Sequence, residues 1–144
     1  MTEGSPVEPI WLEVEVALAI HDRQLAEHGG LQGLRDPGAL AAALERPRQK
    51  WAYGQTDPAG LAAAYAWGLA RRHPFADGNK RTAWVLARLF LVMNGHRLTF
   101  GASEAIQIVL ALASGELEED ALAVWIRERL DPPSPADSAP AGLL

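Results

Sequence analysis

Apolar residues recur every three to four positions along most of the chain, which is the spacing of amphipathic helices. Start and stop signals divide this pattern into segments. Gly29-Gly30 ends the first segment, and Asp36-Pro37 and Asp57-Pro58 each place an N-cap aspartate before a proline at the first helical position. The pattern therefore predicts about six helices, at residues 14–28, 36–45, 57–72, 79–94, 103–113 and 117–130.

The segment at residues 79–94 is apolar on nearly all of its faces, which predicts a central buried helix. The end of the second helix is set by Pro47. Because proline lacks the backbone N–H that a helix interior needs, we expect this helix to end before it. Residues 46–56, in which Trp51 and Tyr53 stand among polar residues, are then predicted to form a loop or a small two-stranded flap.

Composition indicates an all-α fold. The chain has 26 Ala and 20 Leu against 7 Val, 5 Ile and 4 Thr, so helix-favouring residues far outnumber β-branched ones. Its 144 residues are enough to bury a core without disulfides, and the chain has no cysteine. We predict a single domain at residues 1–130 and a disordered tail at residues 131–144, where Pro, Ser and Ala predominate.

Net charge and targeting signals narrow the class of protein further. The chain has 13 Lys and Arg against 18 Asp and Glu, and this formal net charge of -5 disfavours direct binding to nucleic acid. The N-terminus carries acids and prolines where a secretory signal would be basic and then apolar, and no uncharged apolar run approaches a membrane span. We expect a cytoplasmic protein that binds neither nucleic acid nor membranes.

The candidate chemistry is concentrated in residues 71–81, between the third and fourth predicted helices. Lys80 and Arg81 fall in the first turn of a helix, where the macrodipole favours anions, so two cations there indicate that an anion binds. Gly78 permits a left-handed backbone and a close approach, and Asn79 can cap the helix or donate to a phosphate oxygen. The predicted phosphate-binding residues are Gly78, Asn79, Lys80 and Arg81.

Two more side chains of this stretch are candidates for catalysis. Histidine is the side chain best suited to proton transfer under physiological conditions, and His73 stands at the edge of the loop, where it can take a proton from a hydroxyl group as a general base. Asp77 offers a carboxylate beside the predicted phosphates, which suits Mg²⁺ because this ion commonly binds one carboxylate, phosphate oxygens and water. We expect the remaining candidates to have structural roles, and Phe75 to fill a place in the core. These residues are Arg71, Arg72, Phe75, His21, His28 and His96.

Residues 73–82, HPFADGNKRT, resemble the motif of the Fic/Doc superfamily, H-x-F-x-D/E-G/A-N-x-R. Three further stretches resemble death-on-curing (Doc) toxins, namely residues 19–22, 29–36 and 113–117. This resemblance implies a compact all-α fold with a loop and helix that bind nucleotide phosphates, and a flap that docks the target protein. It also implies that His73 is the general base and that Asp77 binds Mg²⁺.

The same resemblance bears on the kind of group transfer. Typical Fic adenylyltransferases have a glycine where this chain has Lys80 and an arginine where it has Trp84, and both departures match the Doc branch. Gly78 stands where Doc members usually have alanine. The Doc resemblance implies a kinase that uses ATP and Mg²⁺ to phosphorylate a threonine or serine of a translation factor, elongation factor Tu, and so arrests translation.

Two alternatives stay open. The chain could be a Fic-type adenylyltransferase, which would transfer the AMP part of ATP to its target. It could also be a catalytically silent module of the same fold that only binds an antitoxin. The intact His73 and Asp77 disfavour the second alternative.

The resemblance also implies a protein partner. The inhibitory Fic motif, S/T-x-x-x-E-G/N, is not met, because Ser114 and Glu118 are followed by Glu119. A separate Phd-like antitoxin, whose C-terminal segment folds on binding, is therefore expected to restrain the protein. We expect partner proteins to dock on residues 46–56 and in grooves between small-residue helices, such as those at residues 62–64.

Overall fold

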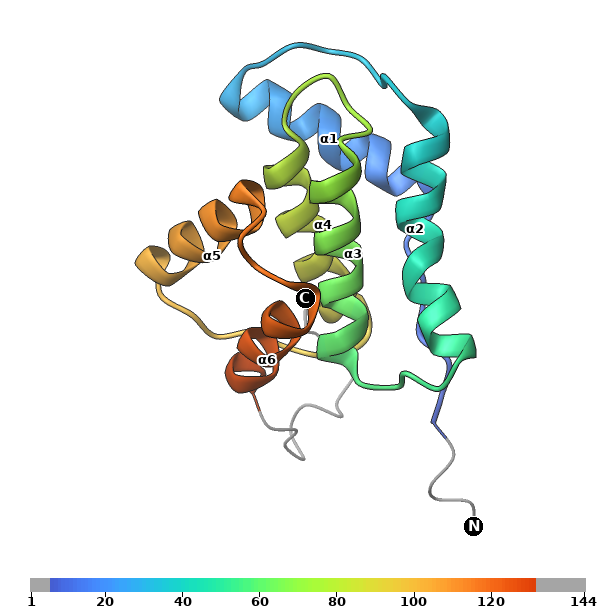
Figure 1. The fold of residues 1–144 in the computed structure, drawn as a ribbon. Helices are drawn as coiled ribbons and strands as arrows, with labels where there is room; N and C mark the ends of the chain where they lie inside the picture. The colour runs from blue at the N-terminus through green and yellow to red at the C-terminus, as the bar shows by residue number, and fades with distance from the viewer. Residues whose placement is uncertain (1–5, 132–144) are drawn as a thin grey trace.

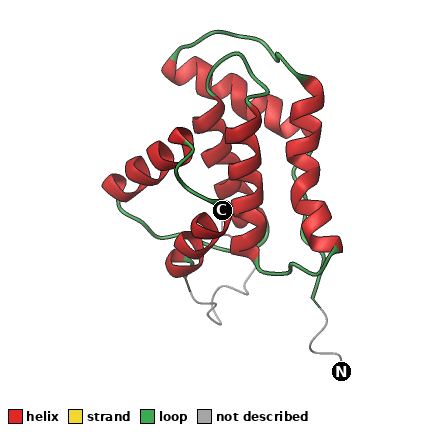
Figure 2. Cartoon of the chain, in the orientation of Figure 1, coloured by secondary structure: helices red, strands yellow, loops and turns green. Residues whose placement is uncertain are grey.

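A computed structural model describes residues 6–131 of the protein, which form six α-helices (Figures 1 and 2). Within this range the only strand-like pairings are two isolated β-bridges, Leu34 with Phe75 and Leu98 with Leu130. The helices are α1 (Val14–His28), α2 (Pro37–Ala52), α3 (Pro58–Arg72), α4 (Asn79–Met93), α5 (Ala102–Ser114) and α6 (Glu119–Arg129). The prediction of an all-α fold of about six helices is confirmed.

Helix α3 lies at the centre of the molecule, and α2, α4 and α6 pack around it (Figure 1). The alanines at residues 62–64 are 0% exposed, and such small side chains let neighbouring helices approach closely. No groove for a partner exists there, so this part of the docking prediction is wrong. Helix α4 shares the core but exposes Arg88 and Val92 along one side, so the central helix is α3 and not the one predicted at residues 79–94.

Helix α2 continues through Pro47 and ends at Ala52. The prediction that it ends at residue 45 is therefore wrong, as is the prediction of a loop or two-stranded flap for residues 46–52; residues 53–56 do form a loop. A proline inside a helix removes one hydrogen bond and typically costs about 3 kcal/mol. The local rule fails here because the residues around the proline make tertiary contacts that only the helical conformation allows.

These contacts fix the last two turns of α2 to the rest of the protein. Arg46 and Lys50 lie one turn apart and both form ion pairs with Glu119, the first residue of α6. On another side of the helix, the ring of Trp51 packs edge-to-face on Trp11, with ring centroids 6.4 Å apart. Continuing the helix past the proline therefore brings two cations to a nearly buried carboxylate and one large ring to the core.

The capping signals are confirmed by hydrogen bonds. Asp36 accepts from the N–H of Ala39 at 3.0 Å, and Asp57 accepts from the N–H of Ala59 at 3.2 Å. The predicted tail at residues 131–144 lies outside the described residues except for Asp131, whose N–H donates to the carbonyl of Arg97 at 2.8 Å. None of the helices in residues 6–131 combines the length and the apolar character needed to cross a membrane.

Candidate active site

The loop between α3 and α4 starts at His73, and this loop and the first turn of α4 together carry all of the predicted site residues. His73 caps α3 with φ 49° and ψ 57°, and among the described residues it alone has a positive φ without being glycine. A non-glycine residue in this region costs about 1–3 kcal/mol, so the surrounding structure must hold it there. The N–H of His73 still donates to the carbonyl of Leu69 at 3.3 Å, and its side chain is exposed. The imidazole therefore stands at the mouth of the loop, open to a substrate.

The middle of the loop is anchored by Phe75 and Asn79. Phe75 is 1% exposed, which confirms the prediction that it fills a place in the core. The Asn79 amide bonds to both backbone groups of Phe75: its oxygen accepts from the N–H and its nitrogen donates to the carbonyl, each at 2.9 Å. Asn79 therefore closes the loop with its side chain, and the second N–H of its amide and its backbone N–H are left for other contacts.

A second segment, residues 29–36, runs beside this loop in an antiparallel direction. The carbonyl of Pro74 accepts from the N–H groups of Arg35 and Asp36 at 2.8 and 2.9 Å, and the N–H of Ala76 donates to the carbonyl of Gly33 at 3.0 Å. The flap-like element beside the motif is therefore residues 29–36 and not residues 46–56. Its glycines and its resemblance to Doc sequences were the signals that could have placed it.

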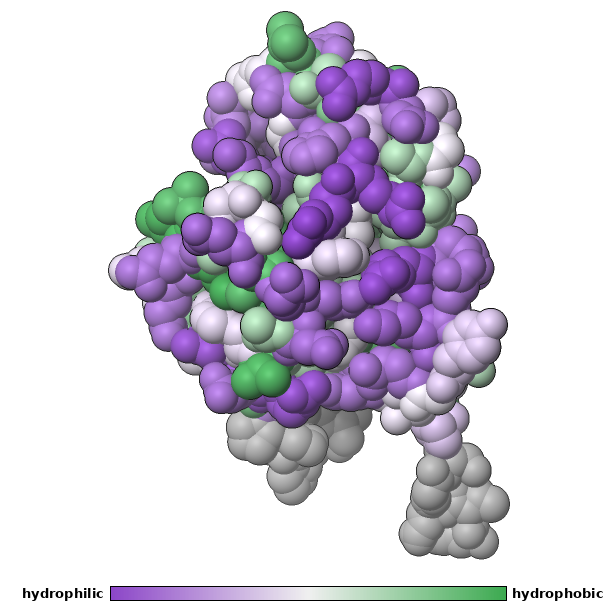
Figure 3. Space-filling view, in the orientation of Figure 1, coloured by the Kyte–Doolittle hydropathy of each residue, from purple (hydrophilic) through white to green (hydrophobic). Residues whose placement is uncertain are grey.

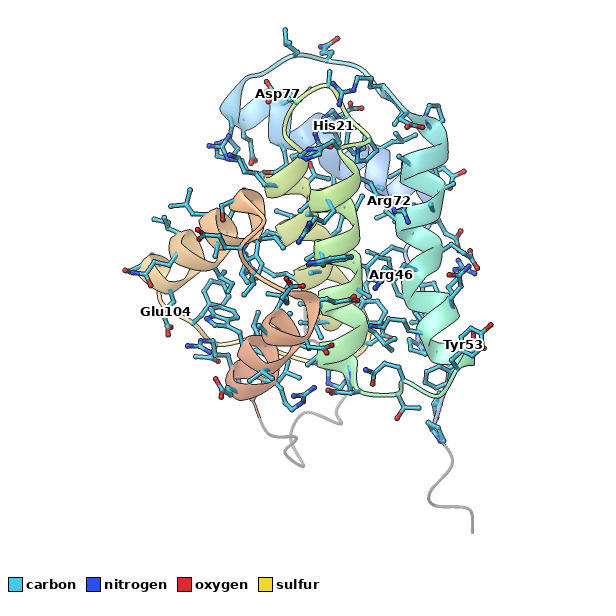
Figure 4. All side chains as sticks on the ribbon, viewed as in Figure 1. His21, Arg46, Tyr53, Arg72, Asp77 and Glu104 are labelled. Atoms are coloured by element: carbon cyan, nitrogen blue, oxygen red, sulfur yellow. The ribbon has the colours of Figure 1, made fainter. Side chains whose placement is uncertain are left out.

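Asp77 is exposed at the tip of the loop (Figure 4). Its carboxylate accepts two backbone hydrogen bonds, from Leu31 at 3.1 Å and from Gly78 at 2.9 Å. These two bonds, that from Leu31 first, lower the pKa of Asp77 below its ordinary value of 3.8, and the charge of Arg81 acts in the same direction. The carboxylate is therefore ionised at neutral pH before any ligand arrives.

The approach of the flap segment to Asp77 depends on Gly30. A Cβ atom built on Gly30 would lie 2.9 Å from a carboxylate oxygen of Asp77, closer than real Cβ atoms come to other atoms. Gly30 also has φ 129°, a conformation that side chains disfavour. Glycine at this position is thus required for the contact between the two segments.

His21 of α1 contacts the same loop from the core side (Figure 4). Its ring stacks on Phe75 with centroids 3.7 Å apart, and its Nε2 lies 2.8 Å from the carbonyl oxygen of Asp77. The structural role predicted for His21 is thus realised through contacts with Phe75 and Asp77 that the sequence did not reveal. The signal for this contact was weak: His21 lies on the buried face of α1, in the stretch at residues 19–22 that resembles Doc sequences.

The start of α4 has the features of an anion site. Gly78 is its N-cap in a left-handed conformation, with φ 76°, and the first turn contains no acidic residue and no side-chain cap. Lys80 and Arg81 are exposed, and within residues 6–131 neither takes part in an ion pair. Free backbone N–H groups and two cations are thus available in one helical turn.

A hollow of about 400 Å³ adjoins this turn, between α4 and α5. Lys80 and Arg81 line one part of it, and apolar residues of α5 line the other. Ile106 and Leu110 are 61% and 58% exposed, and Figure 3 shows apolar side chains gathered over this region. Trp84 borders the hollow but is only 7% exposed, because it packs edge-to-face against Trp125 at 5.8 Å.

Comparison with known proteins agrees with this geometry. The sequence model of the Fic/DOC family matches residues 11–91, which is more than half of the chain and includes the loop and the helix start. The chain belongs to the Fic/DOC family.

Two relatives are more than 30% identical to it. The "Protein kinase doc" of Escherichia phage P1 is 37% identical over 114 residues, covering 78% of this chain and 90% of the relative. The "Toxin Doc" of Mycolicibacterium smegmatis (strain ATCC 700084 / mc(2)155) is 40% identical over 100 residues, covering 66% of this chain and 76% of the relative. The resemblance found in the sequence is thereby confirmed.

The Fic/DOC loop of this chain can accept Mg²⁺ only together with other ligands. Among the described residues, no three His, Cys, Asp or Glu side chains cluster as a metal site. Asp77 has one carboxylate, and each of its oxygens accepts one hydrogen bond and so retains a lone pair. This donor set fits Mg²⁺, which binds through few carboxylates and completes its coordination with phosphate oxygens and water.

Proposed function

We propose that this protein is a Doc-like toxin kinase, which transfers the γ-phosphate of ATP to a threonine or serine hydroxyl of a translation factor. One observation carries the proposal: an ionised carboxylate, the glycine-capped start of α4 and two cations that form no ion pair within residues 6–131 adjoin a loop that begins with an exposed histidine. The relative from Escherichia phage P1 is named a protein kinase, which supports the same reaction. The target we expect is elongation factor Tu.

His73 acts as the general base in this proposal. The hydroxyl oxygen of the target attacks the γ-phosphorus while its proton passes to the imidazole of His73. The bond between the γ-phosphorus and the bridging oxygen breaks, and ADP leaves with the electron pair. The exposed position of His73 allows a protein hydroxyl to reach it.

The other site residues hold and neutralise the nucleotide. Asp77 would bind Mg²⁺, which when present screens the charge of the phosphate oxygens. Gly78 lets the phosphates approach the helix start closely, the N–H groups of the first turn of α4 donate to phosphate oxygens, and Lys80 and Arg81 add positive charge. Asn79 serves this site by closing the loop and through its own backbone N–H.

Two positions favour the kinase over the adenylyltransferase. An adenylyltransferase of this family needs a small residue at position 80, where the phosphates enter, and an arginine at position 84. Lys80 has a long side chain, and Trp84 is packed into an aromatic cluster with no charge to offer. The exposed lysine can instead neutralise a γ-phosphoryl group during transfer.

Radiolabelled ATP tests the assignment. Purified elongation factor Tu is incubated with the protein, Mg²⁺ and ATP labelled on either the α- or the γ-phosphate. We expect label from the γ-phosphate only, and no transfer by the His73→Ala variant. Label from the α-phosphate only would refute the kinase in favour of the adenylyltransferase, and label from neither would support a silent binding module.

The hollow between α4 and α5 is the proposed site for a Phd-like antitoxin. Its apolar side, with the exposed Ile106 and Leu110, suits the apolar face of an amphipathic helix. Lys80 and Arg81 border the same hollow, so a segment bound there would cover the phosphate-binding cations. A peptide of the antitoxin's C-terminal segment should protect α5 and the start of α4 from hydrogen exchange; protection confined to residues 46–56 would refute this placement.

A further inference from the structure

His21 connects helix α1 to the peptide group between Asp77 and Gly78 (Figure 4). Its Nε2 lies 2.8 Å from the Asp77 carbonyl oxygen, and because a carbonyl can only accept, Nε2 must carry the proton. His21 is 3% exposed, and its ring lies nearly parallel to that of Phe75, at an angle of 6°. The imidazole is therefore held in one orientation, with its N–H directed at one acceptor.

This contact sets the direction of the Gly78 N–H. A trans peptide group is planar and points its C=O and its N–H to opposite sides. Since the carbonyl of Asp77 is turned toward α1, the N–H of Gly78 is turned away from α1, and it donates to the Asp77 carboxylate at 2.9 Å. The groups proposed to receive Mg²⁺ and phosphate thus lie on the same side of the loop.

The backbone by itself would not fix this orientation. Gly78 has φ 76°, and glycine populates positive and negative φ about equally, so the peptide group before it can rotate at little cost. A Cβ built on Gly78 would lie 3.7 Å from both Cδ2 and Nε2 of His21, so the ring also lies directly beneath this peptide. The hydrogen bond from His21 is the contact on the core side that distinguishes the two orientations.

We propose that His21 is a positioning residue that fixes the plane of the Asp77–Gly78 peptide group and so keeps the Gly78 N–H bonded to the Asp77 carboxylate, on the side of the loop where the nucleotide phosphates are proposed to bind. The identity of the ligand rests on the function proposed above. His21 does not touch the nucleotide in this arrangement; it acts through Asp77 and Gly78. Packing on Phe75 fixes the orientation of the His21 ring, and the proton on Nε2 fixes the orientation of the Asp77–Gly78 peptide group.

The tautomer of the His21 imidazole tests the proposal on the ligand-free wild-type protein. Nitrogen-15 NMR of the imidazole is expected to show Nε2 protonated and bonded. A proton on Nδ1 alone would overturn the proposal, because Nε2 could then not donate to Asp77. This result does not depend on whether the protein is a kinase.

Two substitutions separate the hydrogen bond from the packing. His21→Gln keeps an N–H donor of similar reach but loses the ring, whereas His21→Phe keeps a flat ring against Phe75 but loses the donor. Binding of ATP with Mg²⁺ is measured by calorimetry, and melting temperatures are measured in parallel. We expect His21→Phe to lose about tenfold in affinity, as for one misdirected hydrogen bond to a charged group, and His21→Gln to stay within about threefold of the wild type.

A merely structural role predicts the opposite order, because phenylalanine preserves the packing better than glutamine. Wild-type affinity in His21→Phe, or an equal loss in both variants, would overturn the proposal. Leu122→Ala, in the core of α6, is the control for lost stability and should bind ATP like the wild type. If His21→Phe does not fold, the proposal is tested by the tautomer of His21 in the wild type and by the affinity of His21→Gln for ATP. Failure of the wild type to bind ATP would refute the proposed function but leave the tautomer test intact.

Discussion

Cationic side chains have different surroundings in two regions of the protein. One region is the loop and helix start at residues 73–81, and the other is the contact between the last turns of α2 and the start of α6. At the α2–α6 contact, Glu119 pairs with both Arg46 and Lys50. At the loop end, Lys80 and Arg81 are exposed without ion-pair partners in the described residues, and the nearby carboxylate of Asp77 accepts its hydrogen bonds from backbone N–H groups. At the structural contact both cations have an ion-pair partner within the protein, whereas at the loop they remain available to an anionic ligand.

This difference predicts that substitutions at the loop end change activity and leave stability alone, while substitutions at the α2–α6 contact do the reverse. The most direct test is His73→Ala. We expect phosphotransfer to fall by about 10²–10⁴-fold, the usual contribution of a general base, with an unchanged melting temperature because the side chain is exposed. The rate is measured with γ-labelled ATP, and growth arrest by a folded, equally expressed variant would contradict the role of His73.

Asp77→Asn removes the charge at the loop but keeps an oxygen that can accept one of the two backbone bonds. We expect the affinity for ATP in the presence of Mg²⁺ to drop by at least about tenfold, because Mg²⁺ binds neutral amide oxygens weakly in comparison with carboxylates. Calorimetric titrations with and without Mg²⁺ measure the effect. Asp120→Asn, an exposed carboxylate at the start of α6, is the matched control, and an equal loss in both variants would argue against a site at Asp77.

Glu119→Gln should lower stability and leave activity unchanged, the reverse of the substitutions at the loop. It leaves Arg46 and Lys50 without a charged partner at a side chain that is 11% exposed, so we expect the free energy of unfolding to fall by about 1–2 kcal/mol. Urea denaturation followed by circular dichroism measures this change. Phosphotransfer by the folded variant should match the wild type, and a large loss of activity would show that the two regions are coupled.

The pH dependence of stability gives a second measure of the same contact. Burial opposes the ionisation of Glu119, but hydrogen bonds from Arg46 and Lys50 outweigh it and lower the pKa of Glu119 below its ordinary value of 4.5. The ionised carboxylate therefore stabilises the folded state above pH 4.5, and this contribution is lost as the pH falls through the lowered pKa. We expect the difference in stability between wild type and Glu119→Gln to shrink on acidification below pH 4.5; a constant difference would contradict the ion pairs.

The smallest effect is expected for an exposed ion pair. Arg23 and Glu27 are one turn apart on α1, with side chains 73% and 50% exposed. Glu27→Gln should lower the free energy of unfolding by at most about 0.5 kcal/mol, because water screens such pairs. Urea denaturation of both variants shows how much more a buried ion pair contributes to the free energy of unfolding than an exposed one. Equal losses of stability in Glu27→Gln and Glu119→Gln would contradict the distinction between the two contacts.

Local signals in the sequence were sufficient where the physical cause is local. Asp36 and Asp57 cap α2 and α3 through bonds to residues two or three positions away, so their patterns predict helix starts reliably. The predictions failed at Pro47, where contacts with α6 and with Trp11 outweigh the local preference for ending a helix. No pattern around the proline contains that information.

The candidate active site shows the same difference between local and long-range causes. The residues from His73 to Arg81 are contiguous, so one motif contained all the groups that the sequence analysis assigned to chemistry. The flap segment and His21 reach this loop across long separations: Leu31 and Asp77 are 46 positions apart in the sequence, and His21 and Asp77 are 56 positions apart. Such pairings depend on how α1 packs against α4, which periodicity and spacing do not specify.

These long separations also determine when the site can form during synthesis. The ribosome releases α1 and the flap segment first, and they have no loop to contact until α3 and the start of α4 have emerged. Until then the Leu31 N–H and the His21 imidazole lack Asp77 as a partner, and a chain that stops before α4 cannot assemble the site. A nascent chain therefore cannot form these contacts until more than half of its residues have been synthesised.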